Sequence, residues 1–224
     1  MKIYLLLLIG MVFVSGCTGQ NIGQTDSAKF TSMELDTGME WNANPSFSPD
    51  DKKIVFETGF GIPDIYMLDM QSKKITKVIA TGAEEGSPAF GPDEKKVIFS
   101  SGGNITIINA DGTDSKTLTN TSNDYDARFS HDGKQILFSS FRSGNSELWI
   151  MDADGNNPRN LTNLGFAMSS EFSPDGKKIV FVIGRKIPDS IYTSMEIAVI
   201  NSDGSGLQIL TDQTTQSGSP AFSS

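Results

Sequence analysis

The chain has 224 residues, with 18 Lys and Arg against 27 Asp and Glu, which gives a formal net charge of −9. This acidic surplus disfavours nucleic acid as a partner, because a phosphate backbone is bound mainly through clustered Lys and Arg. The single cysteine, Cys17, and the single histidine, His131, exclude an intrachain disulfide and a Cys/His zinc site.

The first predicted segment is an export signal at residues 1–16. Lys2 precedes an apolar run that ends at Val14-Ser15-Gly16-Cys17. A charged start, a short apolar stretch and small residues are typical of a secretory signal, and the stretch is shorter than the ~20 residues of a membrane span. Its end resembles a lipoprotein signal box, which implies cleavage before Cys17 and lipidation of the Cys17 thiol. The alternatives are an ordinary cleaved signal and a core helix.

A repeated unit follows from residue 44 and occurs four times before it begins again. Each unit opens with a short strand that ends in Phe, and a turn of the Pro-Asp-Gly type comes next. In such a turn Pro presets φ, Asp bonds nearby backbone and Gly accepts a positive φ. An apolar second strand follows, then a third strand, at residues 64–68, 104–108, 147–151 and 196–200, and then a fourth. The opening Phe stands at Phe47, Phe90, Phe129, Phe172 and Phe222, and the fourth strands lie around Val78, Leu118-Thr119, Leu161-Thr162 and Leu210-Thr211.

Four short strands in every 40 to 50 residues, without a helical period, predict an all-β propeller. A single blade cannot cover both of its faces, so neighbouring blades must cover them. We therefore expect the opening Phe residues and the apolar second strands to fill the spaces between blades. The predicted propeller has four four-stranded blades, at residues 44–81, 87–119, 126–162 and 169–211, plus the first strand of a fifth at 219–224, and is open or incomplete.

The repeat resembles the TolB-like propeller unit, a WD-type unit whose hallmark is Phe-Ser-Pro-Asp-Gly-Lys before an apolar strand. That hexapeptide begins at Phe172, and the third unit matches the family over nearly its whole length, with Ser140-Phe141-Arg142-Ser143-Gly144 and Met151-Asp152-Ala153-Asp154-Gly155. The resemblance covers residues 44–224. TolB itself carries an α/β domain before the propeller and usually six blades, and residues 18–43 are too few for that domain.

The strand count leaves the arc open at its end, because five opening strands stand beside four of each other kind. Residues 17–43 are predicted to be the lipidated N-terminus and a polar tether, of which residues 29–33 would lend an outer strand to a terminal blade. Exposed strand edges invite pairing, so we expect self-association through the open edge, or completion by another propeller protein. The alternative is an inert truncated fragment of a longer propeller.

Catalytic patterns are not evident in the sequence. His131 stands where other units have Pro, inside a hairpin turn, and no nucleophile pattern accompanies it. Lyases of this family bind metal through several histidines. The turns at residues 109–112 and 152–155 lack the further acidic positions of a calcium loop. We therefore expect no catalysis, no cofactor and no metal.

Loop length is the most informative irregularity. The loop between the second and third strands is longest in the fourth unit, residues 184–194, and these loops are expected on one face of the arc. Aromatic residues and Arg in such loops indicate a partner-binding rim. The candidate residues are Phe60, Ile62, Phe141, Arg142, Arg185, Lys186, Ile187 and Tyr192. Asn104, Asn120 and Asn160 fit the glycosylation pattern, with occupancy depending on the host.

Together these features predict an exported, lipid-anchored envelope protein at the cell membrane or outer membrane, facing the periplasm or the exterior. The propeller would serve as a non-catalytic platform that binds a protein or a glycan. The alternative from another class is an enzyme, or an enzyme accessory, that acts on acidic polysaccharide.

Overall fold

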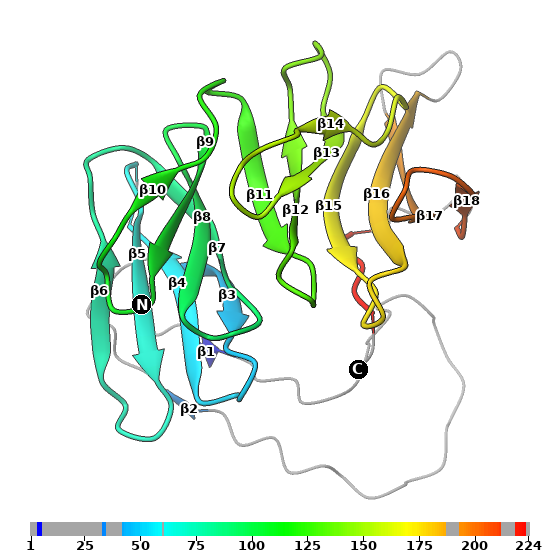
Figure 1. Cartoon of the computed structure of the whole chain (residues 1–224). Coiled ribbons are helices and arrows are strands. Elements are labelled where there is room, and N and C mark those ends of the chain that lie inside the picture. Colours follow the sequence, from blue (N-terminus) through cyan, green and yellow to red (C-terminus); the bar gives the residue numbers. More distant parts are fainter. Residues whose placement is uncertain are drawn as a thin grey trace, which may run out of the picture.

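A computed structural model describes residues 4–5, 33–34, 42–59, 61–186, 193–211 and 218–222. Four antiparallel sheets of four strands follow one another along the chain, and the strands of each sheet lie in chain order. Figure 1 shows these sheets as blades standing side by side. In the described ranges there is no helix with the length and hydropathy of a membrane span. The prediction of an all-β chain with four four-stranded blades is confirmed.

The blades have closely similar strand lengths. Blade 1 contains β3 (Asn42–Phe47), β4 (Lys53–Thr58), β5 (Asp64–Asp69) and β6 (Ile75–Ile79). Blade 2 contains β7 (Glu85–Phe90), β8 (Lys96–Ser101), β9 (Asn104–Asn109) and β10 (Lys116–Thr117). Blade 3 contains β11 (Asp124–Phe129), β12 (Gln135–Ser140), β13 (Glu147–Asp152) and β14 (Arg159–Asn160). Blade 4 contains β15 (Ala167–Phe172), β16 (Lys178–Lys186), β17 (Thr193–Asn201) and β18 (Gln208–Ile209).

The blades form an open arc. Neighbours meet through their first strands: β7 contacts β3 and β4, β11 contacts β7 and β8, and β15 contacts β11 and β12. Among the strands that the structure describes, those of blade 1 make no contact with those of blade 4. The two blades stand at opposite ends of the row in Figure 1. This arrangement is that of an incomplete propeller.

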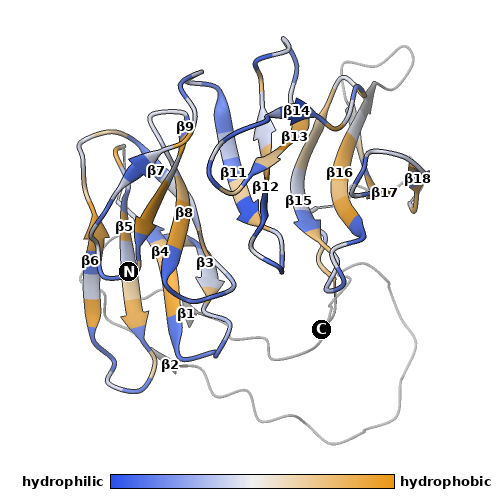
Figure 2. Ribbon diagram, in the orientation of Figure 1, coloured by the Kyte–Doolittle hydropathy of each residue, from blue (hydrophilic) through white to orange (hydrophobic). Residues whose placement is uncertain are grey.

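The hydrophobic core lies between blades, because side chains of a strand alternate between its two faces. In β8, Val97 and Phe99 pack with blade 1, whereas Ile98 packs with blade 3. Figure 2 shows the apolar residues concentrated in the second and third strands of the blades. One expectation is wrong: Phe47, the first opening Phe, is exposed, since no described blade precedes it. The largest fully buried side chains include Phe99, Phe138, Phe172, Phe181, Ile54, Ile98, Ile136 and Leu137.

The hallmark turn is held by its Ser and Asp. In blade 1, Ser48 Oγ donates to Asp50 Oδ1 at 2.7 Å and accepts the N–H of Lys53 at 2.9 Å. The serine therefore joins the end of one strand to the start of the next, which explains its place in the motif. The same bonds recur at Ser130, Asp132 and Gln135 in blade 3 and at Ser173, Asp175 and Lys178 in blade 4.

The fourth strands of blades 2 to 4 are shorter than predicted and end before their Leu-Thr pairs. In blade 3 the N–H of Leu161 donates to the carbonyl of Leu148 at 2.8 Å. Thr162 Oγ1 then accepts the N–H of Leu148 at 3.0 Å. A side-chain hydroxyl thus takes the place of a backbone carbonyl, and the strand pairing stops there. Thr119 and Thr211 accept the N–H groups of Ile105 and Ile197 in the same way.

The first strand of each blade, which we call the inner strand, carries a β-bulge at the same position of the repeat. In β11 the pairing with β12 shifts between Tyr125 and Arg128, and Asp126 between them has a φ of 55°. A positive φ is uncommon outside glycine and is best tolerated by Asn and Asp. The bulge separates the two residues that begin each inner strand from the Phe that ends it. The other blades carry it at Asn44, Ser87 and Ser169.

The two ends of the chain add no strand to the blades within the described residues. Of the segment expected to lend an outer strand, Met33 pairs instead with Leu5, in a separate sheet of β1 (Tyr4–Leu5) and β2 (Met33–Glu34). At the other end, residues 218–222 form no strand. They reach β15, where the N–H of Phe222 donates to Glu171 Oε2 at 3.3 Å.

Candidate functional site

The loops that join second to third strands emerge on the same face of the arc, as Figure 1 shows. Of the predicted rim residues, Ile62 and Phe141 are exposed on this face. Phe60, Ile187 and Tyr192 lie outside the described residues.

The fourth unit differs from the sequence-based expectation of a long loop. Strands β16 and β17 continue their pairing upward as far as Lys186 and Thr193, with Arg185 opposite Ser194. The first and last residues of the predicted loop of residues 184–194 are therefore paired strand residues. Arg185 and Lys186 belong to the end of β16, and their side chains are not among the described ones.

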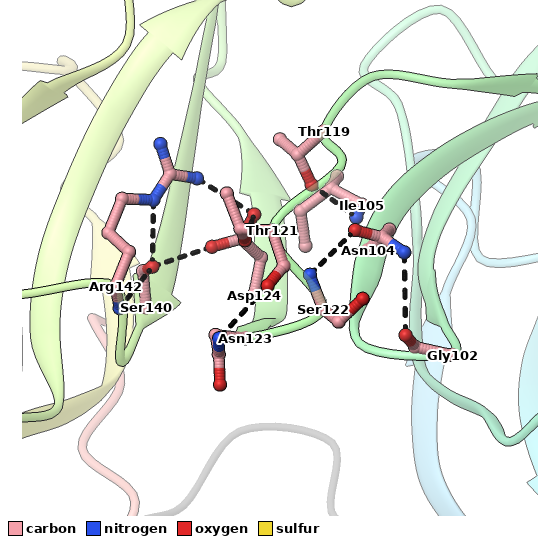
Figure 3. A network of polar contacts seen from close by, with 10 residues as sticks. All are labelled: Gly102, Asn104, Ile105, Thr119, Thr121, Ser122, Asn123, Asp124, Ser140 and Arg142. Carbon is pink, nitrogen blue, oxygen red and sulfur yellow. Dashed lines mark hydrogen bonds and ion pairs between the residues drawn. The ribbon is translucent and has the colours of Figure 1, made fainter. Parts of the chain in front are cut away.

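A buried polar network centred on Asp124, at the top of blade 3, holds Arg142. Arg142 Nη2 donates to Asp124 Oδ2 at 2.8 Å, and its Nε donates to Ser140 Oγ at 3.0 Å. Ser140 Oγ in turn donates to Asp124 Oδ1 at 2.6 Å. Asp124 is fully buried at the start of β11, and Ser140 ends β12. Figure 3 shows that the network links the first two strands of the blade to the loop that follows them.

The preceding blade contributes to the same network. Thr121, in the linker between blades 2 and 3, donates its hydroxyl proton to Asp124 Oδ2 at 2.6 Å. The next residue, Ser122, donates its N–H to Asn104 Oδ1 at 2.9 Å, on the hairpin of blade 2. The linker is therefore tied on both sides, as the dashed lines in Figure 3 show. The tops of blades 2 and 3 are fixed relative to each other.

Two opposing effects set the pKa of Asp124. Burial disfavours the carboxylate, but hydrogen bonds from Arg142, Ser140 and Thr121 outweigh burial and hold the pKa of Asp124 below its usual range. Asp124 is therefore ionised at neutral pH and paired with the guanidinium of Arg142. That guanidinium also stacks over the Trp149 ring, 4.5 Å from its centroid, which fixes the arginine further.

Next to this network in the chain is an exposed aromatic pair. Tyr125 and Phe141 meet edge to face with ring centroids 6.4 Å apart, and they are 41% and 47% exposed. Each is the chain neighbour of a network residue, since Tyr125 follows Asp124 and Phe141 precedes Arg142. The N–H of Phe141 also donates to the carbonyl of Asn123 at 2.9 Å. The backbone that carries the pair is therefore held in place by the hydrogen bonds of Phe141 and of the network residues.

The neighbouring blade 4 carries Met168 at the equivalent position of the repeat. It is exposed, and it holds on β15 the position that Tyr125 holds on β11. The strands β11 and β15 contact each other. We call Tyr125, Phe141 and Met168 the apolar patch.

Sequence reasoning found Phe141 but missed Tyr125 and Met168. The signal was present in the repeat. The second residue of the inner strand is small in blades 1 and 2, where it is Ala43 and Gly86, and large in blades 3 and 4. Large apolar residues at a position where other repeats carry small ones mark a surface peculiar to those blades.

The remaining candidates serve as turns and surface positions. His131 is exposed in the hairpin turn of blade 3, and Asp154 accepts the N–H of Asn156 within its own turn. Over the described ranges there is no group of three or more metal-binding side chains. Asn120 and Asn160 are exposed, while both ends of the Asn104 amide are hydrogen bonded.

The family model of the TolB beta propeller domain matches residues 101–224, more than half of the chain. The chain belongs to the TolB β-propeller family. Among curated proteins no relative was found.

Solved structures of TolB proteins share the fold. TolB from Acinetobacter baumannii is 28% identical, with a TM-score of 0.64 over 76% of this chain and 43% of that one. A protein of Agrobacterium tumefaciens assigned as TolB is 20% identical, with a TM-score of 0.69 over 80% of this chain and 69% of that one. The chain thus spans less than half of the Acinetobacter protein. The oligogalacturonate lyase of Vibrio parahaemolyticus, at 14% identity and a TM-score of 0.60 over 83% of this chain and 57% of that one, shares the fold alone.

Proposed function

We propose that this chain is an exported, lipid-anchored binding protein that holds a partner protein at the apolar patch and carries out no covalent chemistry. The observation that supports this proposal best is the exposed Tyr125–Phe141 pair standing on the buried network of Asp124 and Arg142. Rigid aromatic anchors lose little conformational entropy on binding, so they are the side chains that most often dominate a protein interface.

The chemistry of the patch favours an apolar segment of a protein over a glycan. Methionine is enriched at protein interfaces, and its flexible thioether adapts to the shape of a partner. The guanidinium of Arg142 is bound to Asp124 and Ser140, so it supports the patch from below. We therefore assign Arg142 a positioning role and Phe141 a contact role.

The test is affinity capture from detergent-solubilised envelopes, with quantitative mass spectrometry of the captured proteins. The double variant Tyr125→Ala, Phe141→Ala should recover the partner at least ~10-fold less well, which is the loss expected for hot-spot residues. The matched control is Ile62→Ala, which removes an exposed apolar side chain of blade 1 outside the apolar patch. Equal recovery by both variants would refute the patch, and recovery of polysaccharide in place of protein would favour a glycan.

Membrane attachment is proposed to depend on Cys17. In the sequence it is the single cysteine and follows an apolar run that ends in small residues. We expect the wild-type chain to partition into detergent and to incorporate labelled fatty acid. Cys17→Ser should lose the label and move to the aqueous phase, because the anchoring lies in the acyl chains. A labelled Cys17→Ser chain, or an unlabelled wild type, would contradict the anchor.

A further inference from the structure

The three interfaces between neighbouring blades follow one pattern. The Phe that opens a blade packs against the preceding blade, as Phe172 does against Leu137 and Leu148 of blade 3. The preceding blade offers in return the apolar residue at its fourth strand, such as Leu161, which joins the same cluster. Each interface therefore has a front half, on the following blade, and a back half, on the preceding one.

A close backbone approach completes each interface. The Gly in the turn between the third and fourth strands lies against the fourth strand of the preceding blade. A Cβ at Gly204 would be 3.1 Å from the carbonyl oxygen of Leu161, and a Cβ at Gly155 would be 3.2 Å from that of Leu118. The pattern is thus the same from blade to blade.

At each end of the arc, one residue whose equivalent is buried between neighbouring blades is exposed. Phe47, the opening Phe of blade 1, is 42% exposed, whereas its equivalent Phe172 is 2% exposed. Leu210, beside the fourth strand of blade 4, is 58% exposed, whereas its equivalent Leu161 is 7% exposed. Blade 1 therefore has an opening Phe without a preceding blade to pack on, and blade 4 has a Leu after its fourth strand without a following blade to cover it.

The strands behind these exposed residues carry the apolar side chains of an interface. On blade 1, Ile54 and Phe56 hold the repeat positions of Val97 and Phe99, which pack on the preceding blade. Ile54 and Phe56 are buried in the single chain, so only the margin of the blade 1 face is exposed. At its inner edge blade 4 meets Phe222, which leaves the outer margin at Leu207, Ile209 and Leu210 uncovered.

We propose that two copies of this chain associate head to tail, with blade 1 of one copy against blade 4 of the other. The contact would repeat the type of interface that the chain already forms between each pair of its neighbouring blades. Such a heterologous contact closes when the rotation per copy allows it. Two copies joined at both ends make a ring of eight blades, within the roughly four to eight blades that propellers contain.

Complementation between two variants tests this arrangement. Leu210→Asp removes the back half and leaves Phe47 intact, and Phe47→Asp does the opposite. By sedimentation of the full chain, the wild type should be dimeric, and each variant alone should associate at least ~10-fold more weakly because a buried apolar contact is replaced by a charge. The two variants mixed in equal amounts should form a dimer through the one intact contact. A cooperative thermal unfolding transition shows that each variant is folded, even where weaker association lowers its apparent Tm.

The control is Phe141→Asp, an exposed apolar position away from both ends. It should retain the dimer and lose the partner captured at the apolar patch, so failure of the proposed function and failure of self-association are distinguishable. A monomeric wild type at all concentrations would overturn the proposal. Single variants that remain dimeric, or a mixture that stays monomeric, would overturn the head-to-tail arrangement.

Discussion

Asp124→Asn should lower the free energy of unfolding by about 3 kcal/mol, because it breaks a buried ion pair from one side. The carboxylate accepts hydrogen bonds from Arg142, Ser140 and Thr121. The amide of Asn has one acceptor oxygen, and its N–H groups would face the donors of Arg142, Ser140 and Thr121. Urea denaturation of the two purified chains measures the difference.

The matched control for Asp124 lies two residues further along the same strand. Asp126 forms an ion pair with Arg128 at 3.2 Å, but both side chains are about 30% exposed. Asp126→Asn should cost less than ~1 kcal/mol, because partly exposed pairs contribute little and Asn tolerates the positive φ. Equal costs at the two positions would contradict the central place of the Asp124 network.

The pH dependence of the Asp124 effect has a definite sign. Because the pKa of Asp124 is lower in the folded chain than the unfolded value of about 3.9, its contribution is complete above that pH. The contribution is lost as the pH falls through the folded-state pKa. The stability difference between the wild type and Asp124→Asn should therefore narrow as the pH falls from about 5 towards 2. A constant difference would show that Asp124 stabilises the fold by some means other than its charge.

Phe172→Ala should lower the free energy of unfolding by about 3 to 5 kcal/mol, because it leaves a cavity between blades 3 and 4. The side chain is fully enclosed in the cluster that these two blades share. Thermal or urea unfolding of the variant gives the value.

Phe47→Ala changes the same residue type at the same position of the repeat. Measured at concentrations where the chain is monomeric, its cost should stay below ~1 kcal/mol, since the side chain is exposed at the open end of the arc and its removal leaves no cavity. A large cost in the monomer would mean that this side chain is covered within the single chain.

The repeat allowed the blades to be predicted because its signals are local. Phe172-Ser173-Pro174-Asp175 carries both the strand end and the turn that its Ser and Asp hold together. The end of each fourth strand was less predictable. Thr162 has the β propensity of a strand residue, yet its hydroxyl replaces a backbone acceptor and stops the pairing.

The candidate site could be predicted only in part. Phe141 was found because it lies in a loop, which is where binding residues gather. Tyr125 lies in a strand, and its exposure follows from its place before the bulge in β11, which no single-strand pattern reveals. The role of Arg142 also required the fold, since its partner Asp124 lies 18 residues away on another strand.

The proposed binding role is tested most directly by a photo-crosslinking amino acid, p-benzoylphenylalanine, placed at position 141 of the chain in its own cell envelope. We expect one major protein adduct at position 141, and loss of this adduct when Tyr125→Ala is added. The same probe at position 131, an exposed position in the hairpin turn of blade 3, should not give that adduct. An identical adduct at both positions, or none at position 141, would contradict a partner-binding apolar patch.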